Sequence, residues 1–401
     1  MRSTRARASS GSSRARAGRP RGASAASPPP RSGTPRVGAV TSDGATTTPT
    51  TTSAPPASAE TDGLAADAVS PIGRRIHLSG GGVEAVIGTI AATLASLRVD
   101  GVQLTEPIDE NAWPAYCNGI FLAPWPNRVR DGRWTHDGAT QQLDVTERDR
   151  NNALHGLLQF TDHEIREQTP TSVTLGALIP AQHGWPFTLD SWVRYELVPG
   201  GLRATHGVRN LSGVTAPYAT GVHPYLRLGD VPVRELRVTV PAASYVEVDD
   251  RLNPIGVKPV DGTPVDLRAG RLFSDLDLDT AYADLSPVDG ATAWIEAPDG
   301  SRLTLLQDPD WRWVQVFTTA IFPAGGWTAV DPATSGPDVE GSGYLGGPLG
   351  DAIAIEPMTA PPDALNSGEG LIHLQPGAEW SGSWALRYTP APAAGSSTDL
   401  A

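Results

Sequence analysis

The sequence predicts an all-β protein built as one large antiparallel sandwich. Glycine and proline are abundant, with 43 Gly and 37 Pro among 401 residues. Short runs rich in Val, Leu, Thr and aromatic residues are separated by Gly, Pro, Asp and Asn, which is typical of strands and turns. No run has a convincing helical period longer than a couple of turns, and so many prolines would interrupt helix interiors. Because strands without helices must bury their inner faces against another sheet, we expect a β-sandwich.

The strand pattern continues along the chain. The run from Gly81 to Leu104 alternates apolar stretches with Gly and contains an Asp100–Gly101 turn. Later, Pro298–Ser301 is typical of a hairpin turn between two strands. The other strand-like segments are QQLDVTE, SVTLGALI, FTLDSWVRYEL, LRATHGVRNL, RELRVTVPA and WVQVFTT.

Composition divides the chain into three segments. Residues 1–68 are rich in Ser, Thr, Ala, Pro, Gly and Arg, and we expect disorder there because the apolar content is too low to offset the entropy of ordering. Residues 69–392 carry the strand pattern and are expected to form one extended sandwich domain. Residues 393–401 are expected to be a flexible tail. Within the domain, residues 320–350 are expected to form a long loop.

Charge and cysteine content exclude several functions. The net charge is -13, and only one cysteine, Cys117, is present. The first 70 positions carry a net positive charge and the remainder a larger net negative charge, so the domain itself is acidic and is not expected to bind nucleic acid. A neutral polyol suits that charge. No apolar run approaches the ~20 residues that span a bilayer, so no membrane partner is expected. A lone cysteine forms neither an internal disulfide nor a thiolate cluster, which fits a reducing cytoplasm.

Two histidines have a context that favours chemistry. His155 lies in the segment NALHGL, and His223 lies in GVHPYL. A histidine that precedes proline is held in extended backbone, which suits a fixed side chain at the edge of a cleft. For each of them alone, a structural role is an equally good interpretation. The other six histidines are interpreted as structural.

A carboxylate and an arginine complete the candidates. Glu356 ends the apolar run Ile353–Ile355, and burial would raise its pKa and make it a better base; an ion-paired glutamate is the alternative. Arg128 follows a proline-rich turn, and its planar guanidinium could bind hydroxyls, a carboxylate or simply a loop carbonyl. The sequence has no HExxH, cysteine cluster, serine elbow or phosphate loop, so we expect neither a metal nor a nucleotide.

Taken together, these segments resemble the galactose mutarotase, or aldose 1-epimerase, family over roughly residues 71 to 390. The resemblance implies a β-supersandwich with an open cleft and no required cofactor. It also implies His223 as general acid, Glu356 as general base and His155 near the sugar ring oxygen. Arg128, Asn127, Asp279 and Tyr225 would then bind the sugar. The segments that carry it, in family order, are APWPNRVRDG, LHGL, GWPF, GVHPYL, DLDTAYADL and EPMTAPPDALNSG.

The implied chemistry needs an acid and a base. Mutarotation opens the sugar's hemiacetal ring and closes it on the other face, so one proton leaves the anomeric hydroxyl as another reaches the ring oxygen. We expect the carboxylate of Glu356 and the imidazolium of His223 on opposite sides of the sugar, across a cleft wide enough for a pyranose. Tyr225 and Trp125 are candidates for stacking on the sugar, with a core position as the alternative.

Two alternatives stay open. A hexose 6-phosphate substrate would require converging basic residues, for which Arg130, Arg133 and Arg227 are candidates. A non-catalytic sugar-binding module could use the same cleft, although binding alone does not require both an acid and a base. The 320–350 insertion precedes Glu356 and departs from the family pattern, so the sequence leaves the preferred sugar undecided.

Overall fold

The computed structural model describes residues 70–329, 344–346 and 348–392. The expectations for residues 1–68 and 393–401 therefore lie outside the described residues. The described part is almost wholly β, which confirms the predicted fold class. None of its helices has the length and apolarity needed to cross a membrane.

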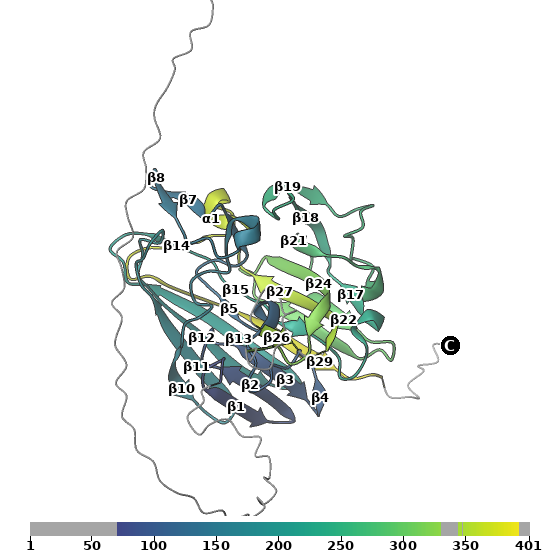
Figure 1. The fold of residues 1–401 in the computed structure, drawn as a ribbon. Coiled ribbons are helices and arrows are strands. Elements are labelled where there is room, and N and C mark those ends of the chain that lie inside the picture. Colours follow the sequence, from purple (N-terminus) through teal and green to yellow (C-terminus); the bar gives the residue numbers. More distant parts are fainter. Residues whose placement is uncertain (1–69, 330–343, 347, 393–401) are drawn as a thin grey trace, which may run out of the picture. The chain divides into compact units, whose positions relative to one another are not determined.

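One sheet of nine strands forms the first layer of the sandwich (Figure 1). Its strand order is β10-β11-β12-β13-β29-β23-β22-β17-β20, and neighbouring strands are antiparallel. The long strands β12 and β13 pair over their whole length, from Leu189 with Asn210 to Val198 with Gly201. The strands are β10 (Glu164–Gln168), β11 (Ser172–Ile179), β12 (Leu189–Val198), β13 (Gly201–Asn210), β17 (Arg237–Thr239), β20 (Arg271–Leu272), β22 (Ala291–Glu296), β23 (Arg302–Gln307) and β29 (Glu379–Thr389).

A second large sheet, of eight strands, carries the residues discussed below. Its order is β19-β18-β21-β24-β27-β15-β5, and β16 also pairs with β27. Its strands are β5 (Phe121–Leu122), β15 (Gly221–Val222), β16 (Tyr225–Leu226), β18 (Ala242–Val248), β19 (Pro254–Pro259), β21 (Asp279–Leu285), β24 (Trp313–Pro323) and β27 (Leu349–Met358).

Smaller elements complete the described part. A four-stranded sheet holds β1 (Arg75–Gly80), β2 (Val83–Gly88), β3 (Leu94–Val99) and β4 (Val102–Gln103). The two-stranded pairs are β6 (Arg128–Arg130) with β9 (Asn152–Leu154), β7 (Arg133–His136) with β8 (Ala139–Gln142), β14 (Ala216–Tyr218) with β28 (Ile372–Leu374), and β25 (Trp327–Ala329) with β26 (Tyr344–Gly346). The helices are α1 (Ala364–Ser367) and the 3-10 turns η1 (Ala115–Cys117), η2 (Arg148–Arg150), η3 (Val233–Glu235) and η4 (Phe273–Asp275).

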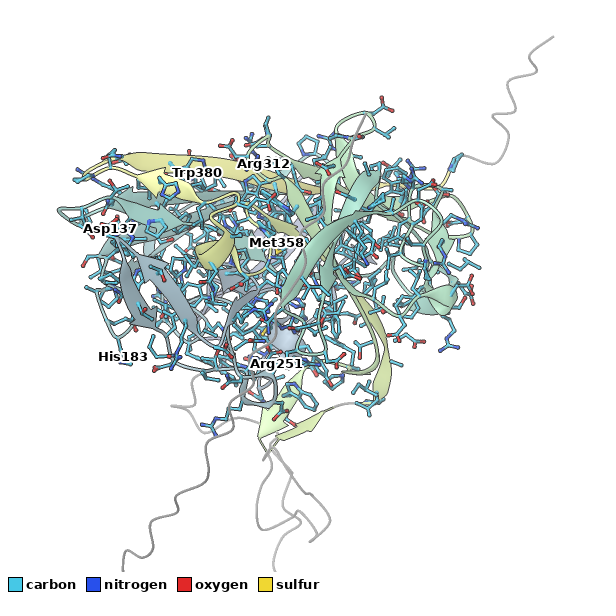
Figure 2. The ribbon with its side chains drawn as sticks, turned by 90° about the horizontal axis from the view of Figure 1, so that it is seen from above. Asp137, His183, Arg251, Arg312, Met358 and Trp380 are labelled. Atoms are coloured by element: carbon cyan, nitrogen blue, oxygen red, sulfur yellow. The ribbon has the colours of Figure 1, made fainter. Side chains whose placement is uncertain are left out.

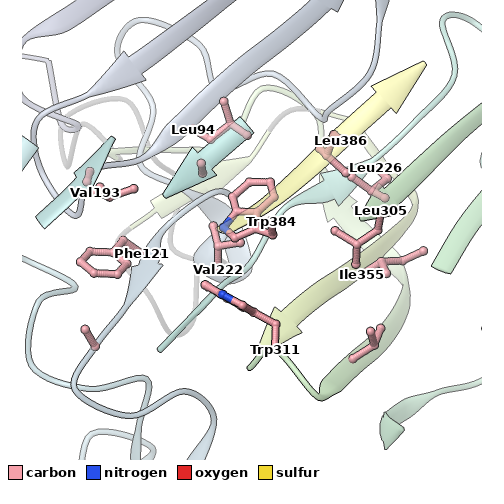
Figure 3. Close-up of a cluster of buried hydrophobic side chains, with 14 of the residues drawn as sticks. Leu94, Phe121, Val193, Val222, Leu226, Leu305, Trp311, Ile355, Trp384 and Leu386 are labelled. Atoms are coloured by element: carbon pink, nitrogen blue, oxygen red, sulfur yellow. The ribbon is translucent and has the colours of Figure 1, made fainter. Parts of the chain in front are cut away.

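The main core lies between the two large sheets. Figure 3 shows side chains of both sheets meeting there, with Val193, Leu305 and Leu386 from the nine-stranded sheet and Val222 and Ile355 from the eight-stranded sheet. All five are fully buried. Burying apolar surface of this kind contributes about 25 cal/mol per Å², so the contact between the sheets stabilises the fold.

Alternation along β27 places one face of the strand in this core and the other face on the opposite side of the sheet. Ile353 and Ile355 belong to the main core cluster, whereas Ala354 and Met358 belong to separate clusters on the other face. Met358 lies near the middle of the molecule in Figure 2, while Asp137 and His183 lie at its periphery. Because side chains alternate with a period of two, Glu356 points away from the core between the sheets.

A histidine is buried deep in this core as a hydrogen-bonded group. His206 has no exposed surface. Its Nε2 accepts from Trp384 Nε1 at 2.9 Å, which leaves the ring proton on Nδ1, 2.8 Å from Thr220 Oγ1. Phe121 and Trp311 pack edge-on against the ring. Burial lowers the pKa of His206 to about 3, so the ring is neutral at neutral pH.

The expectation of a long loop over residues 320–350 is wrong for its described parts. Strand β24 continues to Pro323, β25 pairs with β26, and β27 begins at Leu349. Pairs such as Phe322 with Gly350 extend the β24–β27 hairpin past a bulge. The Gly and Pro content of this stretch suggested a loop, but pairing with neighbouring strands overrides local propensity.

Candidate active site

A cavity of about 330 Å³ opens on the face of the eight-stranded sheet that points away from the main core. Its other wall comes from within residues 115–155, which include η1, β6, η2 and β9. Its volume is within the range of small-molecule sites. It is lined by Tyr116, Cys117, Arg128, Glu147, Arg150, Leu154, His155, His223, Tyr225, Asp279, Phe317 and Glu356.

Glu356 and His223 are held together by strand register. The pairing of β27 matches Tyr225 with Ala354 and Gly221 with Met358, which brings His223 opposite Glu356. Directly opposed residues of antiparallel strands have neighbouring side chains. His223 Nε2 lies 3.2 Å from Glu356 Oε1, and both side chains are almost completely buried. The second oxygen of Glu356 and Nδ1 of His223 are buried with no hydrogen-bond partner in the described part.

Burial shifts the pKa of both members of this pair. Desolvation raises the pKa of Glu356 well above its usual value, and Asp279 raises it further while Arg128 opposes the shift. Desolvation also lowers the pKa of His223 to about 3, helped by the charge of Arg128. Burial thus disfavours the charged form of each group, and the two polar atoms are close enough, at 3.2 Å, to exchange a proton.

The ring of His155 is oriented by the backbone of Asn127. Both residues adopt left-handed backbone conformations, with φ of 60° and 55°. The Asn127 N–H donates to His155 Nδ1 at 3.2 Å, and the His155 N–H donates to the Asn127 carbonyl at 2.8 Å. Burial lowers the pKa of His155 well below its ordinary value, followed by the effects of His223 and Arg128. Because Nδ1 accepts a hydrogen bond, the neutral ring carries its proton on Nε2.

Arg128 and Asp279 form a second, polar part of the cavity. Arg128 Nη2 lies 3.5 Å from Asp279 Oδ2. The other oxygen of Asp279 accepts a hydrogen bond from Gln315 Nε2, and Gln315 is the strand partner of Glu356. The His223–Glu356 pair and Asp279 thus lie on one face of the eight-stranded sheet.

Six of the seven predicted site residues line the cavity: His155, His223, Glu356, Arg128, Asp279 and Tyr225. Asn127 does not line it, so the prediction that Asn127 binds the sugar is not supported. Its backbone holds His155, and its Oδ1 accepts from the Arg128 N–H at 2.9 Å. Asn127 therefore lies behind His155 and Arg128, which line the cavity.

The aromatic candidates have separate positions. Tyr225 stacks on His223 with ring centroids 5.2 Å apart and is fully buried, so it supports the histidine ring. Trp125 packs against Trp185 in the main core and does not line the site cavity, which decides for the core alternative. Tyr116 and Phe317 are the other aromatic residues of the cavity wall.

The expected geometry of acid and base is wrong in one respect. His223 and Glu356 do not face one another across a cleft wide enough for a pyranose, because their polar atoms are 3.2 Å apart. They lie side by side on one wall of the cavity. The ring oxygen and the anomeric hydroxyl of a sugar are both bonded to the same carbon, so neighbouring groups on one wall suit them better than groups on opposite sides.

The arginines considered for a phosphate are bound elsewhere. Arg130 contacts Asp249 Oδ2 and the Pro254 carbonyl, and Arg227 contacts Glu106. Arg133 Nε donates to a glutamine side chain on the neighbouring strand. None of the three lines the cavity. Across the described residues, no group of three His, Cys, Asp or Glu side chains is arranged to hold a metal ion.

The match to a family model decides the identity. Residues 74–387 match the model described as "Aldose 1-epimerase". The chain belongs to the aldose 1-epimerase family. This confirms the resemblance carried by the ordered motifs and places the cavity residues in the setting of a sugar epimerase fold.

Several proteins are similar in sequence or in fold to this aldose 1-epimerase family member. It is 33% identical over 272 residues to uncharacterized protein YihR of Escherichia coli K12, covering 68% of this chain and 87% of the relative. It is 31% identical over 159 residues to rat galactose mutarotase, covering 37% of this chain and 45% of that protein. Solved structures with the same fold include the GalM/aldose epimerase homologue of C. elegans (TM-score 0.66, 20% identity, 80% and 99% coverage) and galactose 1-epimerase of Lactobacillus acidophilus (TM-score 0.63, 19%, 79% and 94%).

Sequence reasoning missed several cavity residues of this epimerase family member. Glu147 and Arg150 lie in the polar stretch TERDRNN, where charged residues are the ordinary composition of an exposed loop. Tyr116 precedes the only cysteine and has a left-handed φ of 46°, which the sequence does not reveal. Gln315 does not line the cavity but donates to Asp279, and its position follows from its pairing with Glu356, a register that requires the sheet order.

Proposed function

We propose that this protein interconverts the α and β anomers of a free, neutral aldohexose such as glucose or galactose. The observation that carries the proposal is the buried pair of Glu356 and His223, 3.2 Å apart on the wall of a cavity of sugar size. A shared proton between a carboxyl and an imidazole is the machinery that ring opening needs. The family supports the reaction class.

The reaction begins with a proton transfer inside the pair. Moving the proton from Glu356 to His223 along their contact gives a carboxylate and an imidazolium. The positive charge of Arg128 favours the carboxylate of Glu356 in this step. Glu356 then takes the proton of the anomeric hydroxyl while His223 gives its proton to the ring oxygen. The bond between the anomeric carbon and the ring oxygen breaks, and an aldehyde forms.

Reclosure reverses these roles. After rotation about the bond between the first two carbons, the hydroxyl that was the ring oxygen attacks the other face of the aldehyde. His223 takes back the proton of that hydroxyl, and Glu356 protonates the aldehyde oxygen. His155 donates its Nε2–H toward the ring oxygen, while Arg128 and Asp279 hold sugar hydroxyls. Each positioned acid or base contributes about a hundred- to ten-thousand-fold.

Polarimetry of freshly dissolved α-glucose and α-galactose tests the proposal. We expect the wild-type protein to accelerate relaxation to the anomeric equilibrium and Glu356→Gln to lose activity by about a hundredfold or more. Glu296→Gln is the matched control, since Glu296 pairs with Arg302 in the nine-stranded sheet. Near-ultraviolet circular dichroism of both variants checks the fold. A folded Glu356→Gln protein with full activity would show that Glu356 is not the base.

The same assay separates the alternatives. Arg130 and Arg227 of the predicted phosphate patch are paired outside the cavity, so we expect no preference for glucose 6-phosphate. Faster relaxation of glucose 6-phosphate than of glucose would contradict a neutral substrate. Binding of aldoses without any acceleration would indicate a non-catalytic sugar-binding module.

A further inference from the structure

Glu147 is a cavity-lining carboxylate to which neither the motifs nor the comparisons give a role. It precedes η2, and paired backbone hydrogen bonds between Glu147 and Asn152 close the turn that carries it. Asn152 Nδ2 also donates to Glu147 Oε2 at 3.1 Å. The Glu147 side chain is 11% exposed. It is therefore held in place by its own loop before any ligand arrives.

This carboxylate binds one edge of the Arg128 guanidinium through two hydrogen bonds. Arg128 Nε donates to Oε2 at 3.0 Å, and Nη2 donates to Oε1 at 3.0 Å. Such a two-point contact fixes the plane of a guanidinium as well as its position. Burial is the largest single effect and raises the pKa of Glu147, but the hydrogen bonds and charge of Arg128, the hydrogen bond from Asn152 and the charge of Arg150 together lower the pKa overall. Glu147 is thus ionised at neutral pH.

The contact with Glu147 determines which N–H groups of Arg128 are left for other hydrogen-bond partners. The Nε and Nη2 edge is taken by Glu147, and Nη2 also faces Asp279. Nη1 has a long contact of 3.5 Å to Asn127 Oδ1. Because a hydrogen bond of this length is weak, the Nη1 N–H groups are the least strongly bonded part of the guanidinium among the contacts of the described residues.

We propose that Glu147 is a positioning residue for the mutarotase site, which orients Arg128 so that its Nη1 edge faces the hydroxyls of a neutral aldose. The inference rests on the proposed function. Glu147 does not touch the reacting atoms and transfers no proton. It acts through Arg128, so its removal weakens sugar binding more than it slows ring opening.

Steady-state polarimetry of Glu147→Gln tests the role. We expect KM for glucose to rise about ten- to a hundredfold, because a displaced guanidinium loses its hydroxyl contacts. We expect kcat to change less than KM, because Glu147→Gln leaves the Glu356–His223 contact in place and Arg128 keeps its positive charge in the cavity. Glu147→Asp keeps the charge at a shorter reach and should recover part of the KM. Glu296→Gln, which also breaks a glutamate–arginine pair, should leave both constants unchanged.

A deoxy-sugar comparison separates positioning from general damage. Among 2-, 3- and 4-deoxyglucose, the one that loses the hydroxyl held by Arg128 should show the largest rise in KM with the wild-type protein. In Glu147→Gln that rise should disappear, because the contact is already lost. An unchanged KM in a folded Glu147→Gln protein, or an undiminished deoxy effect, would overturn the role of Glu147.

The two proposals fail in different ways. If the wild-type protein does not accelerate mutarotation, the proposed function fails, and calorimetric titration with glucose and galactose then tests Glu147 by binding alone. Weaker binding by Glu147→Gln than by the wild-type protein supports the positioning role, and equal binding overturns it. A wild-type protein that binds neither sugar overturns both proposals.

Discussion

Replacing His206 by glutamine should flatten the acid dependence of this protein's stability. The imidazole is fully buried between the two large sheets and is neutral, because Trp384 donates to one nitrogen and the other lies beside Thr220. Burial lowers its pKa to about 3 in the folded protein. The unfolded chain returns this histidine to water, where its pKa is about 6.5. The two states therefore bind different numbers of protons between these values.

The sign follows from the lowered pKa. The unfolded state of His206 binds a proton as the pH falls below about 6.5, and the folded state does not until the pH approaches its own pKa near 3. Acid therefore favours unfolding across this window, and the full stability is present only above the unfolded pKa. Between about pH 7.5 and about pH 5.5, His206 alone lowers the free energy of unfolding by about 1.4 kcal/mol.

Urea unfolding of the wild type and His206→Gln at both pH values measures this term. The glutamine variant is expected to be less stable at both pH values, since it disturbs buried hydrogen bonds. The informative quantity is the difference between the two pH values, which should be smaller in the variant by about 1.4 kcal/mol. Other titrating groups act equally in both proteins and cancel. An identical pH dependence in the two proteins would refute the assignment of His206 as a neutral core histidine.

Two further changes test the backbone that carries the site. Gly156→Ala should destabilise the protein by about 3 kcal/mol, because the new Cβ would lie 2.0 Å from the Ala123 carbonyl oxygen at a φ of +80°; Gly213→Ala, with open space around it, is the control, and equal denaturation midpoints would contradict the clash. Asp363→Ala should cost about 1–3 kcal/mol, because Asp363 Oδ1 accepts from the Arg130 N–H at 2.9 Å. Asp363→Asn keeps an acceptor and should cost less in the same unfolding experiment; an equal loss in both variants would argue against the hydrogen bond.

The fold was predictable because it depends on local patterns repeated many times. Alternating segments such as SVTLGALI and FTLDSWVRYEL became the paired strands β11 and β12. The boundaries near the insertion were not predictable. Gly-rich and Pro-rich residues after Pro323 have weak strand preference, yet Trp327–Ala329 pairs with Tyr344–Gly346. Whether such residues form a strand depends on pairing with a distant segment, and the strand propensity of the residues themselves does not reveal that pairing.

For the site, sequence identified side chains and missed their mutual geometry. The motif residues Arg128, His155, His223 and Glu356 come together in one cavity. Their spacing did not show that His223 and Glu356 are direct neighbours, because this follows from the register of β27 with its partners. Glu147 was missed because its interest lies in its contact with Arg128, which is 19 positions away in the sequence. The catalytic roles of these residues remain predictions for the experiments above.

In the β24–β27 hairpin, the positions of Glu356 and Gln315 do not depend on the length of the chain between the two strands. Glu356 and Gln315 are fixed by a ladder of consecutive pairs from Trp313–Met358 to Thr319–Ala352. The chain between the two strands departs from the far end of this ladder. Its length can therefore change without slipping the register, which would turn Glu356 toward the core. Insertions and deletions there can thus change what packs beside Tyr116, as Trp327 does, while His223 and Glu356 keep their places.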